Sequence, residues 1–289
     1  MGSRRITKDV ALVLSSGGAR GLAHIGAIEE LEAQGYRITS IAGCSMGALI
    51  GGVYAAGKLK EFREWMKTVD RKKMLELTDF SLSLNHIVKG SRIIEAIMEF
   101  VPDVTIENLS IPYCAVATDW KGGQEVAMDK GSLFQAIRAS ISLPIFYEPV
   151  RRDGMILIDG GVTNPIPLNR VVRHKGDILV GVDVSGHDYA AQSELQHEIA
   201  EKRKRSTSLS QQILNKLLPD NLDFNYYTML SRVSSLMIRQ NSILMSQLMK
   251  PDVLVDIQMS RFGGFDYDKS EKLIAIGRQK TQQALRKYG

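Results

Sequence analysis

The sequence predicts an α/β fold in which helices cover a mostly parallel sheet. Short apolar runs, typical of buried parallel strands, recur along the chain. Two of these runs, within 9–14 and 36–42, lead directly through glycine-containing turns into segments with helical spacing. Consecutive strand–helix units of this kind imply parallel strands with helices packed against them. The 289 residues contain no internal repeat and no linker that would separate two domains.

The first unit joins a strand, a glycine-rich loop and a helix. Apolar residues at 10–14 are followed by the loop 15–21, and apolar residues then recur at helical spacing as far as a capping glycine, Gly35. Such a loop presents backbone N–H groups at the positive end of the helix dipole, which is an anion site. The fingerprints for dinucleotides and for nucleoside triphosphates are absent. A third anion is the oxyanion that forms when a serine attacks a carbonyl group. The serine-bearing turn at 43–47 favours this anion over a plain tight turn without a ligand.

The second unit places a serine at the corner between a strand and a helix. The corner reads Gly43-Cys44-Ser45-Met46-Gly47, with a strand predicted within 36–42 and a helix within 46–56. This order is that of a nucleophile elbow, in which a strained turn exposes the serine hydroxyl. Glycines two residues on either side are needed, because a Cβ there would collide where the strand and the helix cross. The pattern alone is a weak signal, and its place between a strand and a helix strengthens it.

The rest of the chain supplies further strands, helices and an acidic motif. Asp159-Gly160-Gly161 follows a predicted strand, and strand ends are where α/β folds place catalytic groups. Glycine-containing turns predict hairpins at 121–123 and 151–154. The remaining strands are predicted at 111–118, 124–128, 147–150, 155–158, 177–184 and 253–257, and the remaining helical segments at 58–89, 91–100, 133–143, 231–250 and 270–287.

Two later segments allow two interpretations each. The polar segment 185–210 is either a mobile surface segment, such as a lid over the site, or the solvated face of a helix. The helical segment 231–250 is rich in methionine, and we favour packing against the core over contact with lipid.

Composition sets limits on location and partners. The net charge of +5 is compatible with approach to anionic lipid surfaces, although an ordinary solvated surface is favoured. No apolar run approaches the ~18 residues that span a bilayer, and the first residues lack the apolar core of a signal peptide. Cys44 and Cys114 are expected to be small buried residues in a reducing compartment. We therefore expect a cytoplasmic protein, with peripheral membrane contact left open.

A serine hydroxyl is a poor nucleophile until a base takes its proton. None of the five histidines has a sequence context that marks it as this base: His24 lies within the first predicted helix, and the others, which are His86, His174, His187 and His197, lie in featureless or surface segments. The alternative is a direct contact between Asp159 and Ser45, which would form a two-residue catalyst.

Three motifs together resemble the patatin-like phospholipase family. They are Gly17-Gly18-Ala19-Arg20-Gly21, Gly43-Cys44-Ser45-Met46-Gly47 and Asp159-Gly160-Gly161, each at the end of a predicted strand. The resemblance spans roughly residues 8 to 185, and the segment 140–146 before the acid also resembles the family's pattern. It implies a three-layer α/β/α fold. We expect a single domain over 1–289, to which 186–289 adds the polar segment, helices and a closing strand.

The resemblance implies hydrolysis of lipid acyl esters by a serine–aspartate dyad. Ser45 would be the nucleophile and Asp159 the base, and the loop from Gly17 to Gly21 would form the oxyanion hole, with Arg20 supporting the loop or the developing charge. Gly43 and Gly47 would shape the elbow, and Gly160 and Gly161 the acid motif. We expect a lipid or ester substrate, no cofactor, no metal and no nucleic acid, and leave the oligomeric state open. Two rivals remain: an acyltransferase or transacylase with the same nucleophile, and a catalytically idle regulatory protein that binds lipid.

Overall fold

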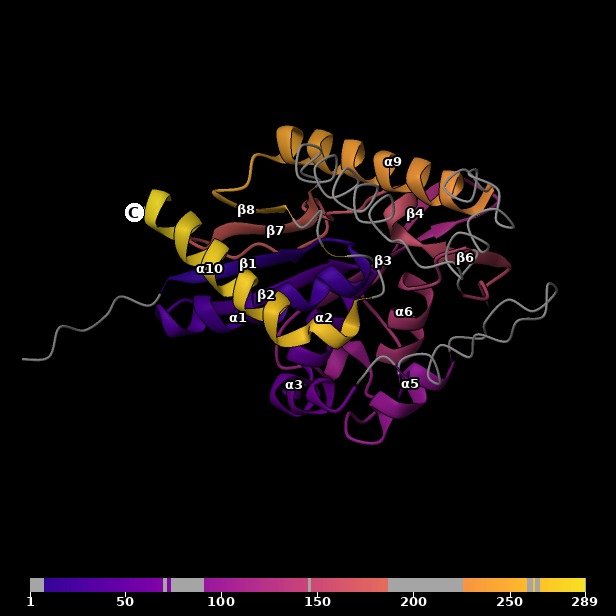
Figure 1. The fold of residues 1–289 in the computed structure, drawn as a ribbon, viewed down its shortest axis with the longest axis horizontal. Coiled ribbons are helices and arrows are strands. Elements are labelled where there is room, and N and C mark those ends of the chain that lie inside the picture. The colour runs from indigo at the N-terminus through magenta and orange to yellow at the C-terminus, as the bar shows by residue number, and fades with distance from the viewer. Residues whose placement is uncertain are drawn as a thin grey trace, which may run out of the picture.

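Figure 1 shows the fold in a computed structural model. The structure describes residues 8–69, 72–73, 91–144, 147–186, 226–258, 262 and 266–288. Most of the segment predicted as a lid or a solvated helix, 187–210, lies outside these residues, as do His86, His187, His197 and most of the charged segment after residue 73. The expectation of a single domain stays a prediction.

All strands among the described residues belong to one sheet. Its order is β5 (Val150–Arg152), β6 (Met155–Asp159), β3 (Tyr113–Asp119), β2 (Arg37–Cys44), β1 (Asp9–Leu14), β7 (Ile178–Gly186) and β8 (Val253–Gln258), and β4 (Gln124–Met128) also pairs with β3. The pairs from β3 through β8 are parallel, whereas β4, β5 and β6 join antiparallel. The predicted mostly parallel sheet is confirmed.

Helices cover both faces of the sheet, so the fold has three layers (Figure 1). One face carries α1 (Ala23–Ala33), α2 (Met46–Ala55), α3 (Leu59–Lys67), α5 (Ser91–Met98), α6 (Leu133–Ser140) and α10 (Ser270–Tyr288). Val10, Leu12 and Leu14 of β1 join the apolar cluster with these helices, while Ala11 and Val13 point to the other face. This alternation is the period of a strand that is buried on both sides.

The second face is covered by the segment around Ile166 and by α9 (Tyr226–Met249). Met245 and Met249 pack against this cluster, as predicted for the methionine-rich helix. Met237, however, is 55% exposed. The helix is therefore fixed along one side only. Of the three methionines in the predicted segment 231–250, Met245 and Met249 pack against the core as predicted, and Met237 does not. Among the described residues, no helix combines the length and the apolar character that a bilayer crossing requires.

The second predicted hairpin needs one correction. Arg151 and Arg152 belong to β5, and Arg152 pairs with Met155, so the turn is confined to Asp153 and Gly154 rather than to four residues. Both turn residues have positive φ, 50° and 76°. A two-residue turn of this kind matches the twist of the flanking strands, which is why Asp-Gly favours it.

The helices α1 and α10 contact each other through backbone at two glycines. A Cβ on Gly26 would lie 1.9 Å from the carbonyl oxygen of Ile274, and a Cβ on Gly277 would lie 1.9 Å from that of Ala23. No real Cβ approaches a backbone oxygen so closely. The position of α10, and with it the covering of β1 and β8, therefore depends on hydrogen in place of a methyl group.

We expect Gly26→Ala to destabilise the protein by about 3 kcal/mol, because backbone must move to admit the methyl group. The measurement is urea unfolding followed by circular dichroism. Gln279→Ala, an exposed change on α10, is the control and should stay within about 0.5 kcal/mol of the parent. A Gly26→Ala variant as stable as this control would contradict the close packing of the two helices.

Candidate active site

The site forms where two strands end against the same edge of β3. Cys44, the last residue of β2, pairs with Val116, and Asp159, the last residue of β6, pairs with the next residue, Ala117. Since β2 runs parallel to β3 and β6 runs antiparallel, the two strands approach each other end to end. The residue after β2 is Ser45. The register therefore places a serine and an aspartate next to each other, although 114 positions separate them in the chain.

Ser45 occupies the strained corner that the sequence predicts. Its φ of 54° and ψ of −121° lie in a region that residues with a side chain rarely adopt. A Cβ on Gly47 would lie 2.2 Å from the carbonyl oxygen of Leu14, and one on Gly43 would lie 2.4 Å from that of Gly47. The predicted collision between strand and helix is thus present at both glycines. The corner presents the Ser45 hydroxyl to Asp159, and Oγ donates a hydrogen bond to Oδ2 at 2.6 Å.

The Asp159 carboxylate is buried, with 1% of the residue exposed. Besides the bond from Ser45, its Oδ1 accepts a hydrogen bond from the Gly161 N–H at 2.7 Å. Burial raises the pKa of Asp159 from 3.8 to about 6, because charge is poorly solvated there, and the two hydrogen bonds offset part of this rise. The carboxylate is therefore mostly ionised at neutral pH and is more basic than an exposed aspartate.

The turn after the acid passes closely over β3. A Cβ on Gly160 would lie 2.2 Å from the carbonyl oxygen of Val116. The neighbouring Cys44 thiol lies 4.0 Å from Oδ1 of Asp159, and burial raises its pKa well above 9.0. Cys44 and Cys114 are both free and buried, as predicted.

The two histidines among the described residues lie elsewhere. The His24 ring is fully buried, and its Nε2 lies 2.9 Å from the carbonyl oxygen of Ser15. Burial lowers the pKa of His24 to about 4, so the ring is neutral at physiological pH. The backbone N–H of His174 donates to the Asp177 carboxylate. In the part of the chain that the structure describes, Asp159 is thus the side chain that the Ser45 hydroxyl contacts.

The glycine-rich loop lies against both other motifs. A Cβ on Gly21 would meet the Met46 side chain at 2.2 Å, and one on Gly161 would lie 3.1 Å from Oγ of Ser16. Gly18 begins a 3-10 helix, Gly18–Leu22, which also contains Ala19, and has a φ of 58°. The first N–H groups of a helix have no acceptor within it and are available to an anion.

Arg20 braces this loop from within. Its Nε donates to the carbonyl oxygen of Gly17 at 3.3 Å. Burial lowers the pKa of the guanidinium, and the nearby Asp183 carboxylate opposes this shift. The structure therefore gives Arg20 a contact with the loop backbone, in keeping with a supporting position.

Ser140 is a site residue to which sequence reasoning assigned no role. It is fully buried at the end of α6, and its Oγ accepts a hydrogen bond from the Ser45 N–H at 2.8 Å. The same hydroxyl donates to the carbonyl oxygen of Val116 at 2.6 Å. Two residues later, the Ser142 carbonyl accepts the Asp159 N–H at 2.9 Å. The segment 140–146 stands out in the sequence only by its similarity to a family pattern, and within it Ser140 and Ser142 hold the elbow and the acid through these bonds.

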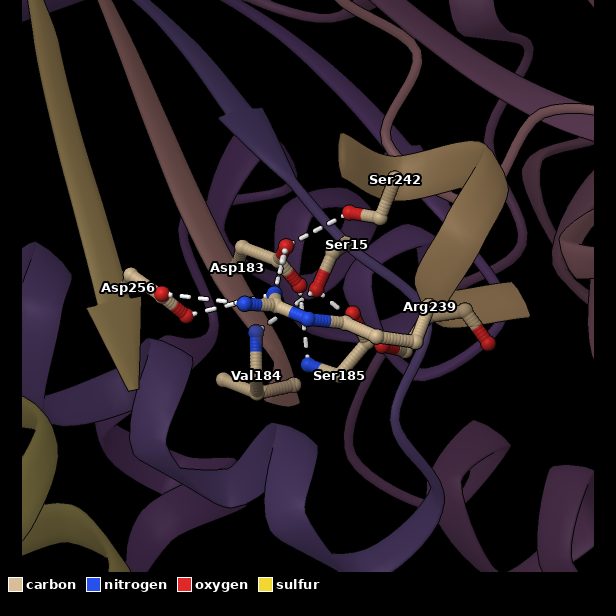
Figure 2. A network of polar contacts seen from close by, with 8 residues as sticks. Ser15, Asp183, Val184, Ser185, Arg239, Ser242 and Asp256 are labelled. Carbon is tan, nitrogen blue, oxygen red and sulfur yellow. Dashed lines mark hydrogen bonds and ion pairs between the residues drawn. The ribbon is translucent and has the colours of Figure 1, made fainter. Parts of the chain in front are cut away.

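A second polar network lies behind the glycine-rich loop, at the ends of β1 and β7 (Figure 2). The buried carboxylate of Asp183 accepts hydrogen bonds from Arg239 and Ser242 of α9, and Arg239 also binds Asp256 of β8. Ser15, at the start of the loop, accepts the Val184 N–H through its Oγ at 2.9 Å. The network ties α9 and β8 to the strand that supports the loop. Asp183, Arg239 and Asp256 are distant in sequence and belong to no motif, so the sequence offered no signal for their pairing.

Near the acid, α9 makes a further contact, in which Asn241 Nδ2 donates to the carbonyl oxygen of Val162 at 3.3 Å. Within the described ranges, no group of three or more His, Cys, Asp or Glu side chains is arranged to hold a metal ion.

Comparison with known proteins gives the relationship of this chain. The family model described as patatin-like phospholipase matches residues 12–172. An uncharacterized NTE family protein of Mycobacterium tuberculosis is 45% identical over 179 residues, which are 62% of this chain and 50% of that protein. The neuropathy target esterase sws of Drosophila melanogaster is 31% identical over 187 residues, which cover 62% of this chain and 13% of that protein.

Among solved structures, the crystal structure of VipD from Legionella pneumophila aligns with 98% of this chain and 67% of that chain, with a TM-score of 0.49 and 14% identity. The chain spans half the length of its mycobacterial relative and a much smaller share of the insect esterase. The family match covers more than half of the 289 residues and includes all three motifs in full. This chain therefore belongs to the patatin-like phospholipase family.

Proposed function

We propose that this chain is a serine hydrolase that cleaves acyl esters of lipids through a dyad of Ser45 and Asp159. The observation that carries the proposal is the hydrogen bond of 2.6 Å from Ser45 Oγ to Asp159 Oδ2 at a nucleophile elbow. Membership of a family described as patatin-like phospholipase supports it, as does similarity to a relative named as an esterase.

In the proposed first half-reaction, the Asp159 carboxylate takes the proton of Ser45 as Oγ attacks the ester carbonyl. The bond from Oγ to the carbonyl carbon forms, and the carbonyl electrons move to oxygen. When the tetrahedral intermediate collapses, the bond to the alcohol breaks, and the leaving alkoxide takes the proton from Asp159. The acyl group remains on Ser45.

The second half-reaction repeats these steps with water. Asp159 removes a proton from water, the hydroxide attacks the acyl carbon, and Ser45 leaves and regains the proton. A transacylase would follow the same path with another alcohol or a thiol in place of water. The Asp159 carboxylate serves as base in both half-reactions, so its raised pKa makes it a stronger base in each of them.

We assign stabilisation of the oxyanion to the backbone of the glycine-rich loop. The loop lies against the elbow at Met46 and against the acid motif at Gly161. These two contacts support the proposal that its first N–H groups face the carbon that Ser45 would attack. Donors held rigidly in a buried site stabilise developing charge more than water does, because they need not reorient. Arg20 would hold the loop through its bond to the Gly17 carbonyl.

We further propose a cytoplasmic location, with which the two free and buried cysteines agree. The substrate is a lipid ester in this proposal, and the acyl chain and head group are left open.

Ser45→Ala should lower ester hydrolysis by at least about 10⁴-fold, because the other nucleophilic group of the elbow, the Cys44 thiol, is buried and protonated. Turnover of a short-chain nitrophenyl ester and labelling by a fluorophosphonate measure the effect. Thr68→Ala, which removes an exposed hydroxyl at the end of α3, should leave both unchanged. Activity retained by Ser45→Ala, or label attached to another residue, would refute the assignment.

The pH dependence of kcat/KM should reflect the ionisation of Asp159. Since the carboxylate must be ionised to act as a base, kcat/KM should fall about tenfold per pH unit below the pKa of about 6 and be level above it. Initial rates from pH 4.5 to 8.5, in buffers of constant ionic strength, test this. A profile centred near pH 7 or above would instead point to a histidine or another base.

Asp159→Asn should abolish activity and yet stabilise the fold at high pH. The folded-state pKa, about 6, lies above the ordinary 3.8, so the ionised carboxylate opposes folding. Its contribution to stability is complete below pH 3.8 and is lost as the pH rises through 6. Relative to the parent, the variant should therefore gain up to about 3 kcal/mol between pH 4 and pH 8. Unfolding by urea at both pH values measures the gain. If the difference in unfolding free energy between variant and parent is the same at both pH values, ionisation of Asp159 does not destabilise the folded protein.

A further inference from the structure

One helix carries half of the large apolar side chains that are exposed among the described residues. This helix is α9, and its exposed apolar residues are Met229, Val233, Leu236, Met237, Leu244 and Leu248. Leu248 is 75% exposed and Leu244 61% exposed. Single exposed apolar residues are ordinary, but a group on one element indicates an interaction surface.

These six residues share one face of the helix. At about 100° per residue, their positions fall within an arc of about 120°, which is the width of an amphipathic stripe. The opposite side of α9 is held by the protein. Arg239 and Ser242 bind Asp183 there (Figure 2), and Met245 and Met249 pack against the sheet. The apolar stripe therefore faces outward because the inner side is fixed, and rotation of the helix would break the buried network.

The stripe reaches the active site. Asn241 binds the backbone of Val162, the residue directly after the acid motif, and Val162 is itself 40% exposed. The end of α9 leads into the start of β8, so the helix runs back across the sheet and its first half extends past the ends of β7 and β8 (Figure 1). With a rise of about 1.5 Å per residue, Met229 lies about 15 Å along the axis beyond Arg239. The apolar face thus begins on the side of the sheet where Ser45 and Asp159 meet.

The charges of the helix are of one sign. Residues 226–250 contain Arg232, Arg239 and Lys250 and no aspartate or glutamate. Asp183 and Asp256 neutralise Arg239 on the inner side, so the exposed cations are Arg232 and Lys250. An apolar stripe on a helix with exposed cations at or beside it and no carboxylate of its own is complementary to a surface of acyl chains and anionic head groups. Two copies that pair through this face would instead bring like charges together, with no carboxylate on the helix to balance them.

We propose that the outer face of α9, defined by these six apolar residues, is the surface by which the protein binds an anionic lipid bilayer. Bound in this way, the mouth of the active site lies beside the lipid, and an ester can reach Ser45 without crossing water. This purpose rests on the proposed hydrolysis of lipid esters, whereas the binding itself requires no catalysis.

The test is flotation with vesicles of phosphatidylcholine and phosphatidylglycerol, with the chain carrying Ser45→Ala so that the lipid is not consumed. Adding Met237→Glu and Leu244→Glu should weaken binding at least about tenfold, since two apolar side chains no longer enter the bilayer and two like charges face its surface. Both positions are exposed, and circular dichroism verifies the fold. The pair Met237→Gln and Leu244→Gln should weaken binding less.

Val172→Glu is the matched control, because Val172 is 47% exposed and lies outside α9. It should bind the vesicles like the parent. Vesicles of phosphatidylcholine alone should bind the parent more weakly. The proposal is overturned if the parent does not bind the mixed vesicles, if the α9 variants bind as the parent does, or if the control loses as much binding. It is also overturned if the variants convert a dimer into a monomer while vesicle binding stays unchanged.

A second readout separates this proposal from the proposed function. With Ser45 present, the α9 glutamate variant should hydrolyse a soluble short-chain ester at the parent's rate and a vesicle-borne ester at least about tenfold more slowly. Vesicle binding through α9 without any hydrolysis would refute the proposed function alone. Hydrolysis together with vesicle binding that the α9 substitutions do not weaken would refute the binding surface alone.

Discussion

The site depends on how β3 divides one of its edges between two strands. Residues 113–116 of β3 pair with β2, whose last residue is Cys44. Residues 117–119 of β3 pair with β6, whose last residue is Asp159. Because β4 occupies the opposite edge, β2 and β6 share this one, and a shift of either strand would break its own ladder with β3. Hydrogen bonds between backbones thus determine the distance between a serine and an acid that the chain keeps far apart. The side chains of Ser45 and Asp159 then meet in a hydrogen bond because the strand register has brought their backbones together.

The strained backbone of Ser45 and the buried carboxylate of Asp159 both depend on the surrounding structure. The glycines of the elbow let the strand and helix approach within contact of backbone, and Ser140 binds the N–H that the unusual Ser45 conformation leaves at the corner. A strained residue costs about 1–3 kcal/mol and persists only where its surroundings determine it fully. Burial of Asp159 adds a further cost at neutral pH, which the core on both faces of the sheet must offset. Such costs are common at catalytic positions, where a group is kept in a state that water would not favour.

Much of the fold followed from the sequence because its signals are local. Runs such as 10–14 and 178–184, and the Asp-Gly turn at 153–154, carry their structure within a few residues. The three motifs were local as well, which is why Ser45, Asp159 and the glycine-rich loop could be named. What the sequence could not indicate is pairing across long separations. Ser140 binding Ser45, and Arg239 binding Asp183, involve residue types that are common everywhere and become specific only by register. The outward face of α9 was missed for a related reason, since methionines at helical spacing do not reveal which side the core takes.

The cysteine beside the elbow has a consequence for chemical probing of this protein. The Cys44 thiol stays protonated at all moderate pH values and lies beneath the turn, where the acid motif covers it. A protonated thiol without access to solvent reacts slowly with alkylating agents and oxidants. Electrophiles that modify the protein at its elbow should therefore react with the Ser45 hydroxyl rather than with Cys44. Oxidative conditions that inactivate thiol enzymes should leave Cys44 and the contact between Ser45 and Asp159 intact.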